Sequence, residues 1–145
     1  MHLITFHSAQ RLTGLSRRTL WRRIAQGALK SPHRNRIALE LVLKDIPVPL
    51  SATDIASILR ADQGEAEAQH EVALLFMGYQ HAERALPWLQ SAADLGCTDA
   101  MYWLGRGYIA GHALPQDEHL GLSWICRAAR DGHFIAQQQM TALNL

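Results

Sequence analysis

A spacing of 36 residues recurs in the second half of the chain and restricts its fold more than any other feature. When the sequence is shifted by this amount, Trp88 falls on Trp124 and Gly96 falls on Gly132. Three alanines keep the same register, namely Ala92 with Ala128, Ala93 with Ala129 and Ala100 with Ala136. Periods of about 20 to 50 residues are typical of stacked helix pairs. We therefore predict helical hairpin repeats over residues 65–145.

Small and large side chains have different tasks in such a hairpin. Alanines at fixed positions let neighbouring helix backbones approach closely, while Trp88 and Trp124 fill the space between helices. The glycines of the same register are placed to end the second helix of each pair. Ala68 precedes its tryptophan by 20 residues, whereas Ala100 precedes the next tryptophan by 24. The additional residues fall in a predicted loop at 111–117.

Several strings of the second half resemble Sel-one-like repeats, a family of tetratricopeptide-related helical hairpins. The strings lie at residues 66–69, 85–93, 111–117 and 124–133. The resemblance covers residues 65 to about 140, and it implies a short α-solenoid that binds a protein partner without chemistry of its own. Because two copies and a fragment make a short array, we expect the helices predicted at 51–62 and 134–143 to act as caps.

A proline-containing segment precedes the repeats. Pro47 and Pro49 disfavour continuation of a helix. Ser51 and Asp54 then match a capping box, with aspartate in place of the usual glutamate, and open a helix that runs to about Asp62. The chain is therefore divided into a head (1–46), a linker with a capping helix (47–64) and the repeats (65–145).

Charge is distributed very unevenly between these parts. Residues 1–36 hold eight of the 14 basic residues and none of the 13 acidic ones. The formal charge is therefore +8 up to position 36 and −7 beyond it. Such an asymmetry indicates a nucleic-acid-binding segment. The alternatives are a solvated basic face, or a surface that binds RNA or an acidic protein.

Residues 8–24 have the pattern of two short helices joined by a sharp turn. Gly14 provides the turn, and Ser16 is a good N-cap for the second helix. Apolar residues fall where the two helices would share a core: Leu12, Leu15, Leu20 and Ile24. Arg17 and Arg18 occupy the first turn of the second helix, where a recognition helix enters the major groove, and Arg22 shares much the same face. Arginine suits both guanine edges and phosphates.

The same stretch resembles the winged helix-turn-helix of the excisionase and MerR-like group. The matching residues are Ala9, Leu12, the run 14–20, and Gly27-Ala28-Leu29. A β-hairpin wing follows in that group, and residues 30–36 have the turn residues and charges of a wing tip. Residues 37–46 fit a strand by their alternating apolar residues, or a helix; we favour the strand.

Binding of duplex DNA is expected from Ser16, Arg17, Arg18, Arg22, Arg23, Lys30, His33, Arg34 and Arg36. The long dimerisation helix of MerR proteins is missing, so a homodimer would use another surface.

Residue patterns that carry catalysis are missing from the sequence. None of the eight histidines forms a close ligand pair with a cysteine or a carboxylate. There is no glycine-rich phosphate loop, nucleophile elbow or paired-carboxylate arrangement. We therefore expect neither enzyme activity, nor a cofactor, nor a metal.

Cys97 and Cys126 fit small buried residues of a cytoplasmic protein, and no signal peptide or membrane span is predicted.

The combined prediction is a mainly α protein, with a helix-turn-helix head (its wing left open) and a short α-solenoid. Its predicted function is that of a DNA-binding transcriptional regulator or adaptor whose repeats receive a protein partner or a second copy. A non-enzymatic scaffold that does not bind DNA is the alternative from another class. In a third interpretation the acidic repeats fold over the basic head and mask it.

Overall fold

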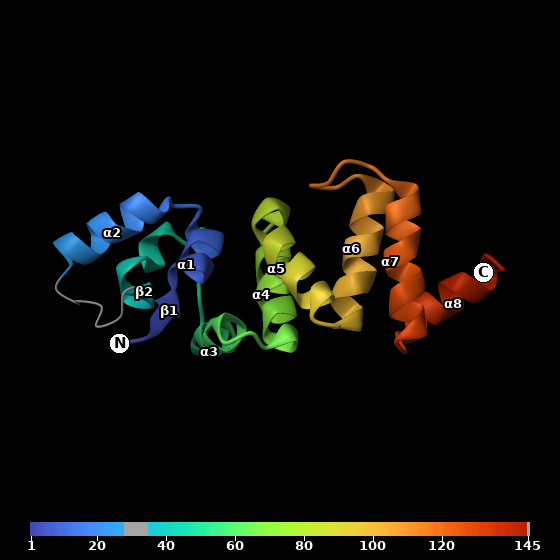
Figure 1. Ribbon diagram of the computed structural model, residues 1–145, viewed down its shortest axis with the longest axis horizontal. Helices are drawn as coiled ribbons and strands as arrows, with labels where there is room; N and C mark the ends of the chain where they lie inside the picture. Colours follow the sequence, from blue (N-terminus) through green and yellow to red (C-terminus); the bar gives the residue numbers. More distant parts are fainter. Residues whose placement is uncertain (28–34, 145) are drawn as a thin grey trace.

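The computed structural model describes residues 1–27 and 35–144, which are mainly helical with one small antiparallel sheet. The elements follow one another along an elongated molecule, with the N-terminal elements at one end and α8 at the other (Figure 1). Their bounds are β1 (Leu3–Thr5), α1 (Phe6–Thr13), α2 (Arg17–Gln26), β2 (Arg36–Ala38), the short 3-10 helices η1 (Leu39–Leu41) and η2 (Leu43–Asp45), α3 (Ala52–Asp62), α4 (Ala66–Gly78), α5 (Ala82–Asp94), α6 (Thr98–Ala110), α7 (Glu118–Arg130) and α8 (Phe134–Ala142). No helix of this described part is long and apolar enough to cross a bilayer.

Side-chain caps begin α1 and α2, and a left-handed glycine separates them. The Thr5 hydroxyl accepts a hydrogen bond from the Ser8 N–H at 3.1 Å, and the Ser16 hydroxyl accepts one from the Thr19 N–H at 3.2 Å. Gly14 has φ +75°, a conformation that favours glycine, and it ends α1. The predicted turn at Gly14 and the predicted N-cap at Ser16 are confirmed.

The predicted strand over residues 37–46 is wrong beyond Ala38. β2 is only three residues long and pairs antiparallel with β1, so that Leu3 lies opposite Ala38. The Leu39 N–H donates to the His2 carbonyl at 2.7 Å, and the chain then enters the two 3-10 helices. Burial follows Leu39, Val42 and Ile46 instead of every second residue. A spacing of three and four places these side chains on one side of a helical turn, which is where the core lies.

Each helix from α3 to α8 packs on the next one along the chain. Ser51 and Asp54 form the predicted capping box at the start of α3. Gly96 and Gly132 follow the ends of α5 and α7 with φ +99° and +105°, as their place in the 36-residue register predicts. Alanines of the register are fully buried in both copies: Ala92, Ala100, Ala128 and Ala136.

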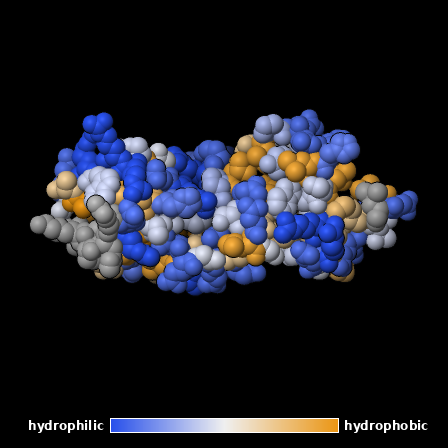
Figure 2. All heavy atoms as spheres, in the orientation of Figure 1, coloured by the Kyte–Doolittle hydropathy of each residue, from blue (hydrophilic) through white to orange (hydrophobic). Residues whose placement is uncertain are grey.

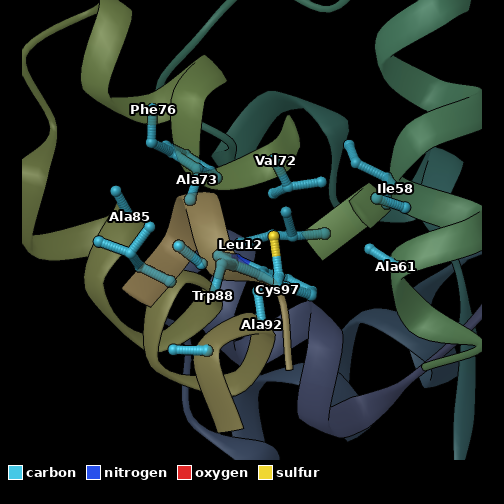
Figure 3. Close-up of a cluster of buried hydrophobic side chains, with 14 of the residues drawn as sticks. Leu12, Ile58, Ala61, Val72, Ala73, Phe76, Ala85, Trp88, Ala92 and Cys97 are labelled. Atoms are coloured by element: carbon cyan, nitrogen blue, oxygen red, sulfur yellow. The ribbon is translucent and has the colours of Figure 1, made fainter. Parts of the chain in front are cut away.

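One hydrophobic cluster joins the N-terminal elements to the helices that follow. Leu12 of α1 is fully buried, and Figure 3 shows it beside Trp88, among side chains of α3, α4 and α5. The Arg11 guanidinium lies 5.4 Å from the Trp88 ring centroid, and burial lowers the pKa of this arginine. Val48 of the predicted linker is also buried, at 5% exposure. Residues 1–27 and 35–46 therefore share one core with α3–α5.

Asp62, at the end of α3, connects this helix to the sheet and to α1. Its side chain is 3% exposed. One carboxylate oxygen accepts hydrogen bonds from the Thr5 N–H at 3.0 Å, the Thr5 hydroxyl at 2.7 Å and the Ser8 hydroxyl at 2.6 Å. The other oxygen lies 3.7 Å from the Arg36 guanidinium. These contacts satisfy the buried carboxylate, as burial of a charge requires.

We expect Asp62→Ala to lower the free energy of unfolding by about 2–4 kcal/mol, because it leaves three part-buried donors without their acceptor. Urea denaturation followed by circular dichroism measures this change. Asp94→Ala is the matched control, since Asp94 is exposed and, among the described residues, its side chain accepts a single hydrogen bond, from Gln90. Its expected effect is within about 0.5 kcal/mol. Equal losses for the two variants would contradict the role given to Asp62.

Candidate nucleic-acid interface

α2 presents arginines and a tryptophan to solvent along one face. Successive helical residues are about 100° apart, so Arg18, Trp21, Arg22 and Ala25 lie on the same side of α2. All four are exposed, whereas Leu20 on the opposite side is fully buried. Figure 2 shows strongly hydrophilic atoms over the part of the molecule where Figure 1 places α2. Arg17 is also exposed and lies beside Trp21, one turn earlier. We call Arg17, Arg18, Trp21 and Arg22 the α2 face.

Two residues of the α2 face are held in place by Phe6. The Arg17 guanidinium lies 5.1 Å from the Phe6 ring centroid and donates a hydrogen bond to the Asn35 side-chain oxygen. The Trp21 ring meets the Phe6 ring edge-to-face, with 5.1 Å between centroids and an interplanar angle of 88°. Both contacts are favourable geometries for aromatic rings. The first two turns of α2 therefore pack against the start of α1.

Positive charge at the start of α2 is not neutralised by neighbours. Among residues 1–27 and 35–144, no ion pair involves Arg17, Arg18 or Arg22. The first turn of α2 holds no acidic residue, and Ser16 caps it. A helix N-terminus carries a partial positive charge and free N–H groups, which adds to the attraction for an anion such as a phosphate.

Two of the predicted DNA-binding arginines contact carboxylates within the protein. Arg23 pairs with Asp45 at 2.9 Å, with both side chains largely buried at 24% and 19% exposure. This ion pair connects α2 to η2, so we assign Arg23 to the fold and not to the interface. Arg36 lies 3.7 Å from Asp62 but keeps 45% of its side chain exposed. The other predicted residues, Lys30, His33 and Arg34, lie outside the described residues.

Sequence reasoning did not single out Trp21. It follows Arg17 by four residues and Arg18 by three, so it lies between these two arginines on the helix surface and its position on the α2 face was readable from the helical period. Its exposure of 42% is high for a tryptophan. A planar side chain at this position adds apolar contact area between two charged groups.

The acidic half of the chain does not cover the α2 face. Figure 1 shows α2 at one end of the molecule and α6, α7 and α8 towards the other end. The exposure of Arg18 and Arg22 agrees with that placement. The interpretation in which the acidic repeats mask the head is therefore not the arrangement observed.

In the described part of the chain, no three histidine, cysteine, aspartate or glutamate side chains are placed to hold a metal ion. Cys97 and Cys126 are both free thiols. Comparison of the chain with known protein families, with curated proteins and with solved structures gave no match.

Proposed function

We propose that the protein is a DNA-binding regulator or adaptor, in which α1 and α2 form a helix-turn-helix and α2 enters the major groove of duplex DNA. The observation that supports this proposal is the α2 face, with Arg17, Arg18 and Arg22 exposed and without ion pairs among the described residues. Arginine binds guanine edges and phosphates through paired hydrogen bonds. Arg36, near the same end of the molecule, is a further phosphate contact in this proposal.

In the proposal, α4–α8 act as Sel-one-like repeats that receive a protein partner. Figure 1 places α7 and α8 at the end of the elongated molecule that is opposite to α2. The buried cluster around Leu12 and Trp88 joins the two regions without a free linker. A partner bound to the repeats would therefore be held at a set distance and direction from the DNA.

A protein scaffold that does not bind DNA is the second candidate. The exposed Trp21 beside two arginines favours it, because tryptophan and arginine are the residues that contribute most to protein–protein interfaces. In that function the α2 face would bind an acidic protein surface. Direct measurement of DNA binding separates the two candidates.

The experiment is a salt titration of the full chain against a duplex of about 30 base pairs, followed by fluorescence anisotropy. We expect log K to fall with log salt concentration with a slope of about −3 to −5, since each neutralised phosphate contributes about −0.9. Absence of binding at about 50 mM salt would reject the DNA-binding proposal and leave the scaffold.

A further inference from the structure

An apolar groove of about 280 Å³ lies among α5, α6 and the loop that leads into α7. Leu86 and Leu89 line it from α5, Trp103 and Gly107 line it from α6, and Leu114 lines it from the loop. Figure 2 shows hydrophobic atoms gathered at the surface between the positions of α5 and α6. The groove is distant from the α2 face along the molecule.

Gly107 keeps this groove open. A Cβ atom at residue 107 would lie 3.5 Å from Leu114 Cδ1 and 3.9 Å from the His112 carbonyl oxygen, both ordinary contacts. A methyl group therefore fits, whereas a large side chain would project into the groove and fill it. The free volume exceeds the cavity of about 150 Å³ that accommodates benzene, so an aromatic or branched aliphatic side chain can enter.

The rim of the groove is cationic. Arg106 is exposed, and its guanidinium lies 5.2 Å from the Trp103 ring centroid and 5.7 Å from that of Tyr102. It takes part in no ion pair with the residues whose positions are described. The lining residues include His112 but no aspartate or glutamate. An arginine already positioned by two aromatic rings loses little conformational freedom when it binds an anion.

We propose that this groove binds a short segment of a protein partner that carries one large apolar side chain next to a carboxylate. The apolar side chain occupies the space against Gly107 and Trp103, and the carboxylate pairs with Arg106. The inference rests on the proposed function only in giving the repeats a protein partner, and it adds the place and the chemistry of that contact. A phosphate of a nucleic acid could pair with Arg106, but it would leave the apolar lining of the groove exposed to water. A peptide that also supplies an apolar side chain therefore fits better.

Selection from a phage-displayed library of random peptides, with the full chain as target, tests the groove. We expect enrichment of peptides with an aromatic or aliphatic residue next to an aspartate or glutamate. For a synthesised peptide of this kind, Gly107→Phe should raise Kd at least about 10-fold because the ring occupies the groove. The matched control Gly107→Ala should change Kd less than about twofold, because a methyl group fits. Circular dichroism verifies that both variants are folded.

Ala110→Trp provides a second obstruction of the groove. Ala110 lines the groove but is exposed, so a larger side chain there does not disturb the core, and a rise in Kd is again expected. Failure to enrich any peptide would overturn the proposal. So would a selected peptide that binds Gly107→Phe and Ala110→Trp as tightly as the parent protein.

The carboxylate contact is tested with Arg106→Gln. We expect this substitution to raise the Kd of the selected peptide about fivefold. Replacing the peptide carboxylate by an amide should then cause no further rise in Kd for the Arg106→Gln variant, because the carboxylate has already lost its partner. Independent losses from the two changes would overturn the assignment of Arg106.

DNA binding measured in parallel should be unaffected by every groove variant. Peptide binding without DNA binding supports the groove and rejects the DNA role, whereas DNA binding without peptide selection rejects the groove.

Discussion

Replacement of both Arg18 and Arg22 by alanine is expected to weaken binding to duplex DNA about 100-fold at moderate salt, which corresponds to about 2.7 kcal/mol. Both side chains are exposed on the same side of α2, and neither belongs to an ion pair among the described residues. Each contact with a base edge or phosphate contributes about 1–3 kcal/mol. The slope of log K against log salt should also become shallower by about two phosphate contacts. Anisotropy titrations at several salt concentrations measure both quantities.

The matched control removes the same charge from the far end of the molecule. Arg127 and Arg130 of α7 are exposed, so the double alanine variant should keep its fold and change DNA affinity less than about threefold. Thermal unfolding of both double variants shows whether stability has been affected. Equal losses of affinity in the two variants would mean that net charge, and not the α2 face, determines binding.

Trp88→Ala is expected to lower the free energy of unfolding by about 3–5 kcal/mol, the range for removal of a large buried aromatic side chain. Trp88 is 1% exposed and belongs to the cluster that contains Leu12 of α1. The loss should therefore extend to the N-terminal elements, and amide hydrogen exchange of α1 should accelerate together with that of α4 and α5. Urea denaturation measures the free energy, and hydrogen exchange locates the loss.

Two further variants serve as controls for Trp88. Trp88→Phe should cost much less than Trp88→Ala, because most of the buried ring surface is kept and the Trp88 Nε1–H has no hydrogen-bond partner within the described residues. Trp124→Ala makes the same substitution at the equivalent, half-buried position of the next copy and should cost about half as much. If α1 keeps its protection in Trp88→Ala, the N-terminal elements fold independently, contrary to our expectation.

Local signals were readable from the sequence because their physical causes lie within a few residues. Ser16 caps α2 through the N–H of Thr19, three residues away, and Gly14 adopts its left-handed conformation through its own lack of a Cβ atom. Gly96 and Gly132 occupy equivalent left-handed positions for the same reason. A helical period also determines which residues share a face, so the sequence alone places Arg18 and Arg22 together.

Strand pairing depended on the remainder of the chain. Residues 37–46 alternate like a strand, but a strand persists only while a partner is available, and β1 provides three residues. Beyond them the apolar side chains follow the core instead. The N-terminal residues that form the partner carry no strong strand signal of their own, so neither the length nor the register of the pair could be predicted.

The sequence alone determined a mainly helical chain, a 36-residue register of packed alanines and glycines, and a cluster of arginines on one capped helix. Only the tertiary structure decided which arginines stay free. Arg23 is 22 residues from Asp45 in sequence, and Arg36 is 26 from Asp62, yet folding brings each pair within ion-pair distance. Charge counts and helical periods contain no information about such separations, because the energy of an ion pair depends on distance and burial in space. For that reason the interface that we propose is smaller than the arginine-rich head, with Arg17, Arg18 and Arg22 as its cations without an ion pair among the described residues.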